Sequence, residues 1–208
     1  MAQLYSSDCN QSIEGKTMVD VVGLDIETSN YSHEIGGWNN TSMFDPVVVA
    51  TSSPEGDTIY TNAEVNSDMM ENTTTVKSLH PQTLGDDLMD MVNKGYNIVG
   101  HNIKMFDLPI LRDALDCWAA GDLLSKKVSL IDTSFLIKQA AQRQNSAVAL
   151  SLNELCRHTL KKTKILTSND APVLWKQGKY DLVSLYCLED ARLSRALWEH
   201  GKNEGVVK

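Results

Sequence analysis

The chain has 208 residues, of which 42% are apolar and 22% are charged, and 27 acidic residues outweigh 19 basic ones to give a net charge of −8. This composition excludes a collagen-like or disordered chain and predicts a single domain over residues 1–208, with its core at about 18–200 and short tails. Four scattered cysteines predict neither a zinc knuckle nor a redox pair. Because no apolar run reaches about 18 residues and no targeting segment is recognisable, we expect a cytoplasmic protein with no membrane partner.

The chain is predicted to begin with three strands. Residues 18–27 form an apolar run that carries two acids near its end, residues 46–50 are mostly valine, and residues 57–61 follow a Pro-Glu-Gly turn. The turn predicts that the second and third strands form a hairpin. Residues 28–45 and 62–78 are rich in Gly, Asn, Ser and Thr, and we expect both to be loops.

Helices then alternate with short strands. Residues 82–94 place leucine, methionine and valine at helical spacing, and residues 97–100 follow a glycine as a short buried strand. The next helix is predicted over residues 107–120. Its Pro109 falls in the first turn, where proline is tolerated.

Four more elements complete the prediction. A strand is expected over residues 128–131 and a helix over 132–143. Ser151 and Glu154 form a capping box that opens a helix ending near residue 160, and the last helix is expected over 181–200. Three strands followed by strand–helix alternation predict an α/β fold, in which a mixed sheet of three antiparallel and then parallel strands is flanked by helices.

Two carboxylates lie side by side on the first predicted strand. Because successive residues alternate between the faces of a strand, Asp25 and Glu27 share one face, opposite Leu24 and Ile26. They fall at the carboxyl end of the strand, where α/β sheets usually bind ligands. A hard cation between the two would relieve their repulsion, whereas an acidic strand face exposed to solvent would need no ligand.

A third carboxylate, Asp190, lies within an apolar stripe of the last predicted helix. Val183, Leu193 and Leu197 share this stripe, and Tyr186 leaves the same face one turn before Asp190. Burial of an unpaired carboxylate would cost on the order of several kcal/mol. Asp190 therefore needs a partner, which is either a metal ion or an arginine in a structural salt bridge.

The segment that leads into the helix at 107–120 adds a fourth carboxylate. Gly100-His101-Asn102 ends a predicted strand, and Asp107 occupies the first turn of the helix. An acid in that turn is favoured by the helix dipole alone, so Asp107 by itself does not indicate a site.

Taken together, these segments resemble the DEDD exonuclease superfamily, the ribonuclease H-like, DnaQ-like family that includes the proofreading domains of DNA polymerases. Leu24-Asp25-Ile26-Glu27-Thr28 is similar to its first motif, and Gly100-His101-Asn102 with Phe106-Asp107 is similar to its second. Tyr186-x-x-x-Asp190 is similar to its third motif. Because tyrosine stands four residues before the aspartate and Leu185 takes the place where another branch has histidine, the chain resembles the DEDDy branch.

This resemblance implies a set of catalytic residues. Asp25, Glu27, Asp107 and Asp190 would hold two Mg²⁺ or Mn²⁺ ions at the scissile phosphate of a 3′-terminal nucleotide. Tyr186, with an ordinary pKa of about 10, would orient the attacking water rather than act as a base.

Further substrate contacts follow from the resemblance and from loop aromatics. Thr28 and Asn102 would line the sugar or phosphate of the terminal nucleotide, although strand-end and cap hydrogen bonds explain them equally well. Trp38, Phe44 and Trp175 fall in predicted loops, where they would stack on bases or only anchor their loops.

Residues 157–179 are strongly basic in an otherwise acidic chain. They include Lys161, Lys162 and Lys164 and carry a net charge of +5, which predicts either a lip for a nucleic-acid strand or a solvated helix end. The overall charge of −8 weighs against binding to phosphate backbones, but two divalent cations would reduce it to −4.

The sequence thus predicts a stand-alone 3′–5′ exonuclease that releases nucleoside 5′-monophosphates from single-stranded DNA. An exoribonuclease that trims RNA would use the same carboxylates, because they do not contact the 2′-hydroxyl. A catalytically silent module that binds nucleic acid or a protein is the alternative of another class. Partners would be single-stranded 3′ ends, DNA before RNA, and a polymerase or another replication or repair protein.

Overall fold

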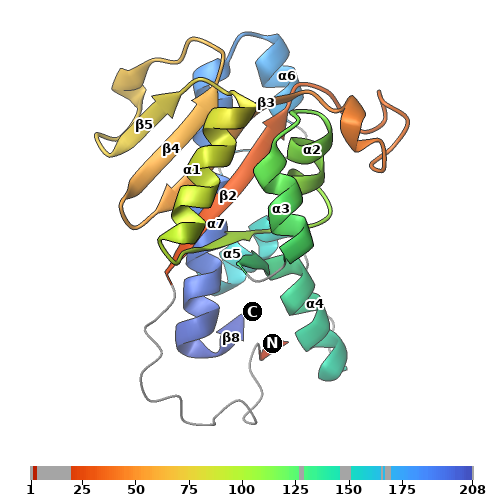
Figure 1. Cartoon of the computed structure of the whole chain (residues 1–208). Coiled ribbons are helices and arrows are strands. Elements are labelled where there is room, and N and C mark those ends of the chain that lie inside the picture. The colour runs from red at the N-terminus through yellow and green to blue at the C-terminus, as the bar shows by residue number, and fades with distance from the viewer. Residues whose placement is uncertain are drawn as a thin grey trace.

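The structure is a computed structural model that describes residues 2–3, 20–126, 129–145, 151–164, 166 and 170–207. Its centre is a six-stranded sheet with helices on both faces (Figure 1). The strands are β2 (Val21–Thr28), β3 (Pro46–Ser53), β4 (Gly56–Thr61), β5 (Thr74–Lys77), β6 (Asn97–Gly100) and β7 (Leu130–Asp132). The helices are α1 (Pro81–Asn93), α2 (Asp107–Asp113), α3 (Trp118–Lys126), α4 (Thr133–Arg143), α5 (Leu152–Thr159), α6 (Ala171–Lys176) and α7 (Tyr180–Glu204).

The sheet is mixed, as the sequence predicts. Its order is β5-β4-β3-β2-β6-β7, in which β2, β3 and β4 are antiparallel neighbours and β6 and β7 continue parallel to β2. A separate two-stranded ribbon pairs β1 (Ala2–Gln3) with β8 (Val206–Val207). Within the described part of the chain, no helix combines the length and the apolar character that a membrane span needs.

Three local predictions are wrong. The expected loop at 62–78 contains β5, a short edge strand that runs parallel to β4, and α6 lies in a region where no helix was expected. The helix expected over 107–120 is two helices. Its break contains Asp116, whose φ of 58° cannot continue a right-handed helix, and the amide of Cys117 bonds to the carbonyl of Leu111 at 2.9 Å.

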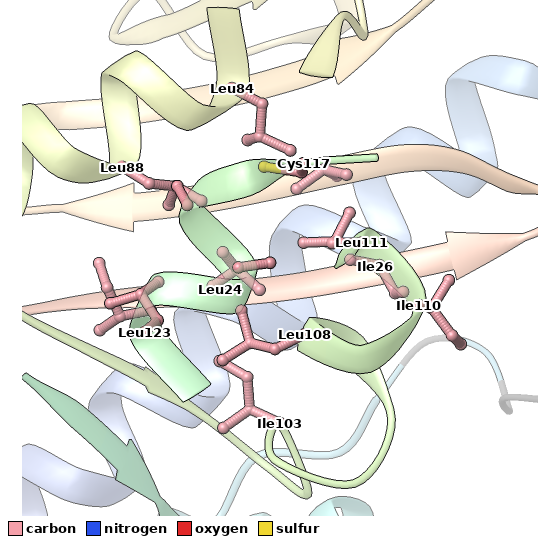
Figure 2. Packing of buried hydrophobic residues seen from close by; sticks show 14 of the residues in the cluster. Leu24, Ile26, Leu84, Leu88, Ile103, Leu108, Ile110, Leu111, Cys117 and Leu123 are labelled. Atoms are coloured by element: carbon pink, nitrogen blue, oxygen red, sulfur yellow. The ribbon is translucent and has the colours of Figure 1, made fainter. Parts of the chain in front are cut away.

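One face of the sheet is covered by α1, α2 and α3. The alternation of β2 points Val22, Leu24 and Ile26 into this layer. There Leu24 and Ile26 meet the leucines of α1 and α2, among them Leu84 and Leu111 (Figure 2). The apolar face of β2 is therefore fully occupied, and its acids lie on the opposite face.

The opposite face is covered by α7, which crosses β2 and β3 (Figure 1). This helix packs against the strand backbone at Gly23, where a Cβ atom would lie 2.1 Å from the carbonyl oxygen of Ala191. Because only glycine permits that approach, Gly23 sets the depth at which α7 lies on the sheet. The neighbouring residues Asp25 and Asp190 are brought together by the same contact.

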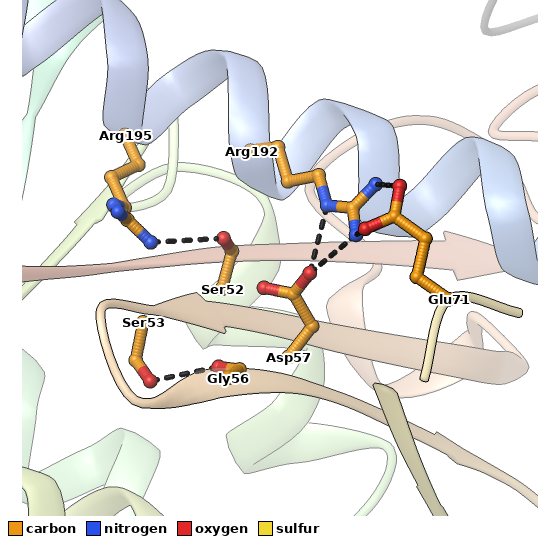
Figure 3. A network of polar contacts seen from close by, with 7 residues as sticks. All are labelled: Ser52, Ser53, Gly56, Asp57, Glu71, Arg192 and Arg195. Atoms are coloured by element: carbon orange, nitrogen blue, oxygen red, sulfur yellow. Dashed lines mark hydrogen bonds and ion pairs between the residues drawn. The ribbon is translucent and has the colours of Figure 1, made fainter. Parts of the chain in front are cut away.

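A partly buried ion-pair network fixes the outer part of the same face. The guanidinium of Arg192 on α7 donates to Asp57 of β4 at 2.6 and 2.8 Å and to Glu71 at 2.9 Å (Figure 3). One turn later, Arg195 donates to Ser52 of β3 at 3.3 Å. These bonds attach the segment before β5 to α7 (Figure 3).

Candidate metal centre

Three carboxylates converge between β2 and α7. Asp25 and Glu27 lie on the face of β2 that α7 covers, and Asp190 projects toward them from the helix. One oxygen from each carboxylate lies within 4.8 Å of those of the other two. Only 9% of Glu27 and 4% of Asp190 is exposed, and Asp25 is partly buried.

Asp107 approaches the same site from the first turn of α2. It is buried and lines the same cavity, but its carboxylate lies outside the set of mutually close oxygens. Burial raises the pKa of Asp107 to about 7, although the backbone amides of Asp107 itself and of Ile26 act in the opposite direction. The structure thus gathers all four predicted acids at one cavity, three of them in direct proximity.

The charges of the cluster are poorly compensated. Burial, followed by the charges of Asp190 and neighbouring acids, raises the pKa of Asp25 well above its ordinary range, and burial also raises that of Glu27. Among the described residues, Oδ2 of Asp25 is buried without a hydrogen-bond partner. Hard oxygen donors with an unsatisfied buried atom fit Mg²⁺ or Mn²⁺, which prefer carboxylate ligands.

One cation of the chain already reaches this cluster. The ammonium of Lys164 pairs with Oδ2 of Asp190, and only 10% of the lysine side chain and 6% of the aspartate side chain are exposed. The same ammonium lies 4.8 Å from the centre of the Tyr186 ring. The position of Lys164 is fixed further by its amide, which donates to the side chain of Asn153 at 3.2 Å.

Replacement of Lys164 by methionine is expected to leave Asp190 uncompensated beside Asp25 and Glu27. The free energy of unfolding in EDTA should fall by about 3 kcal/mol, because breaking a buried ion pair strands the remaining charge. Mn²⁺ should raise the unfolding temperature of the variant more than that of the wild type, because no ammonium competes for Asp190. Thermal unfolding in EDTA and over an Mn²⁺ titration measures both effects.

Lys162→Met is the matched control, because Lys162 is exposed and lies two residues upstream. It should leave both the stability in EDTA and the Mn²⁺ response unchanged. An equal Mn²⁺ response of the Lys164 variant and the wild type would show that the ammonium does not compete with a metal ion.

Tyr186 is buried beside Asp190 on α7. Burial, followed by the charge of Asp190, raises the pKa of its phenol above the ordinary value. The phenol therefore stays protonated at neutral pH and can donate a hydrogen bond, but it cannot accept a proton as a base.

A cavity of about 720 Å³ opens over the acids. Thr28 and Asn102 line it, and so does Lys164. The hydroxyl of Thr28 donates to the carbonyl of Asn30 at 2.9 Å. Asn102 adopts a left-handed backbone with φ of 68°, and its backbone N–H donates to the carboxylate of Asp132 at 3.2 Å. These two residues and Lys164 are the predicted substrate contacts that the structure brings to the acids.

Three other predicted contacts do not line this cavity. Lys161 and Lys162 are exposed after the end of α5. The sequence predicts a loop at Trp175, but the residue lies in α6. There its ring packs on Tyr180 with 4.6 Å between centroids. The predicted basic lip is also divided by ion pairs, because Arg157 bonds to Glu154 and Lys176 to Glu34.

Asp132 holds the backbone beside the site through three hydrogen bonds, two of which the sequence does not predict. It caps α4 by accepting from the amide of Phe135 and also accepts from those of Asn102 and Lys104, at 3.1–3.2 Å. The aspartate immediately before a helix signals the cap, but no local pattern reveals the two amides 28 and 30 residues upstream.

In comparisons of the sequence with known proteins, no family model and no curated protein matches the chain significantly. The interpretation of the site therefore depends on its geometry and on the order of its motifs.

Proposed function

We propose that the chain is a DEDDy-type 3′–5′ exonuclease with a ribonuclease H-like fold, which hydrolyses single-stranded DNA from its 3′ end and releases nucleoside 5′-monophosphates. The observation that carries this proposal is the convergence of Asp25, Glu27 and Asp190, with Asp107 and Tyr186, at one cavity. The mixed sheet, with its antiparallel strands followed by parallel ones, is compatible with that fold.

The carboxylates would hold two Mg²⁺ or Mn²⁺ ions. Asp25, Glu27 and Asp190 supply the mutually close oxygens, and Asp107 adds a fourth carboxylate across the cavity. Bound there, the ions would polarise the scissile phosphate and lower the pKa of the attacking water to about 7.

The remaining residues would position the reactants. The phenol of Tyr186, which stays protonated at neutral pH, would donate a hydrogen bond that orients the attacking water. Thr28 and Asn102 would face the terminal nucleotide. Lys164, displaced from Asp190 by a bound metal ion, would offer its positive charge to a phosphate oxygen. A polymerase or a repair protein would be the partner that delivers the 3′ end.

A single assay tests the activity and the sugar preference. The purified protein is incubated with 5′-labelled single-stranded DNA and RNA of the same sequence, in Mg²⁺, Mn²⁺ or EDTA. We expect a ladder of products shortened from the 3′ end, absent in EDTA and stronger with DNA. Shortening of RNA alone would assign an exoribonuclease, and the absence of any cleavage by the folded protein would overturn the proposed activity.

A further inference from the structure

The segment that follows the metal-binding strand, residues 29–45, is built as a compact projection. Its two ends are joined by the bond from the amide of Ser29 to the carbonyl of Asp45 at 2.9 Å, and Asn30 bonds to Met43 and Asp45 across it. In Figure 1 it is the orange segment that projects beside α2 at the end of β2. A loop held in this way can present a side chain in a fixed position.

Two contacts anchor this projection to the helices on either side of the site. The hydroxyl of Thr41 donates to Asp113 at the end of α2 at 2.5 Å. On the other side, Glu34 pairs with Lys176 of α6 at 3.0 Å, and the same ammonium lies 5.8 Å from the ring of Tyr31. The projection therefore spans the space between α2 and α6 beside the acidic cavity.

Trp38 lies at the surface of this projection on an aromatic base. Its ring meets Phe106 edge to face with 5.6 Å between centroids and lies 6.2 Å from Phe44, which is itself buried. Despite this support, 65% of Trp38 is exposed. The indole is therefore held from one side and offers a flat apolar face to solvent on the other, where another ring can stack on it.

The same ring lines the cavity of the acids. Trp38, Phe44 and Phe106 form one wall, and Phe106 directly precedes Asp107. Tyr31 and His33, stacked with 5.1 Å between centroids, line the cavity too. A ligand whose phosphate reaches the carboxylates can thus extend a flat group onto the exposed indole without leaving the cavity.

We propose that Trp38 is a stacking platform for an unpaired nucleobase of the substrate, so that the site selects single-stranded nucleic acid over phosphodiesters that lack bases. This inference rests on the proposed function. The ligand needs two features in one molecule, a phosphodiester for the acids and a flat apolar ring for the indole, and a polynucleotide combines them. Stacking on an aromatic ring is independent of base identity, so no sequence preference follows from it.

Binding of oligonucleotides with and without bases tests this role. A fluorescent ten-nucleotide DNA is titrated in Mg²⁺ into the full chain carrying Asp25→Asn to prevent turnover, and a second DNA carries abasic residues at its four 3′-terminal positions. We expect the abasic DNA to bind about tenfold more weakly. With Trp38→Ala added, the DNA with bases should lose about the same factor and the abasic DNA should lose nothing.

Trp118→Ala is the matched control, because Trp118 is 44% exposed but does not line the cavity. It should retain the preference for bases, and circular dichroism melting checks that each variant is folded. Trp38→Phe keeps a smaller ring and should keep part of the preference. Quenching of tryptophan emission by the DNA with bases, lost in Trp38→Phe, is a second readout of stacking.

The outcomes separate this inference from the activity. If the abasic DNA binds as well as the DNA with bases, or if Trp38→Ala keeps the preference, Trp38 does not stack on bases, even where the wild type shortens DNA. If the wild type neither binds nor hydrolyses either polymer, both the proposed function and the stacking role fail.

Discussion

Asp25→Asn is expected to abolish hydrolysis while leaving the fold intact. The substitution keeps the shape of the side chain but removes the central charge of the cluster formed with Glu27 and Asp190. Loss of a metal ligand removes several kcal/mol of transition-state stabilisation, which corresponds to a fall of roughly 10³-fold or more in rate. Initial rates on a labelled oligonucleotide in Mg²⁺ measure it, and a rate within tenfold of the wild type would rule out the proposed centre.

The same variant should gain stability in the absence of metal. The pKa of Asp25 is raised in the folded protein, so its ionisation favours unfolding as the pH rises above its ordinary value of 3.8. Asparagine carries no such charge. In EDTA the variant should therefore unfold at a higher temperature than the wild type at pH 7, and the difference should shrink toward pH 4.

Gly23→Ala is expected to lower the stability and the activity of the protein together. The added methyl group would lie 2.1 Å from the carbonyl oxygen of Ala191, so either β2 or α7 must shift. Overpacking of this kind costs about 3 kcal/mol, which lowers the melting temperature of a chain of this size by about 6–12 °C. The displaced helix would also move Asp190 away from Asp25, so activity should fall together with stability.

Gly121→Ala provides the comparison. Gly121 lies in α3, and a Cβ there would meet only the side chain of Arg112 at 3.7 Å. Because alanine favours the helix over glycine, this variant should gain about 0.5–1 kcal/mol. Chemical denaturation of both variants checks the pair, and a stable Gly23→Ala protein would show that α7 does not depend on this close approach.

The elements that the sequence predicts well are those with a strong local pattern. The alternation around Leu24 and Ile26, and the apolar stripe that includes Val183 and Leu193, correctly assign β2 and α7 and the faces that they bury. Elements that depend on contacts between residues far apart in the sequence are not predicted. β5 forms only because β4 offers a free edge, and no glycine or proline marks the break at Asp116.

In the candidate site, too, local patterns predict some residues and miss others. The acids on β2 and α7 follow from strand and helix periodicity, because both elements are regular. The pairing of Lys164 with Asp190 cannot be predicted from periodicity, because no single helix or strand contains both residues. A lysine in a basic stretch looks like a solvated charge until its position in the fold is known.

The long helix α7 couples local opening of the site to unfolding of the whole protein. Between Tyr186 and Arg192 this helix carries two residues of the site, Tyr186 and Asp190, as well as the contact with Gly23 and the ion pairs of Arg192. A local opening that frees the site would have to break the sheet contact and the ion pairs as well. The amide hydrogens of this stretch should thus exchange with solvent only through global unfolding, so the candidate site should lie in one of the most protected parts of the molecule.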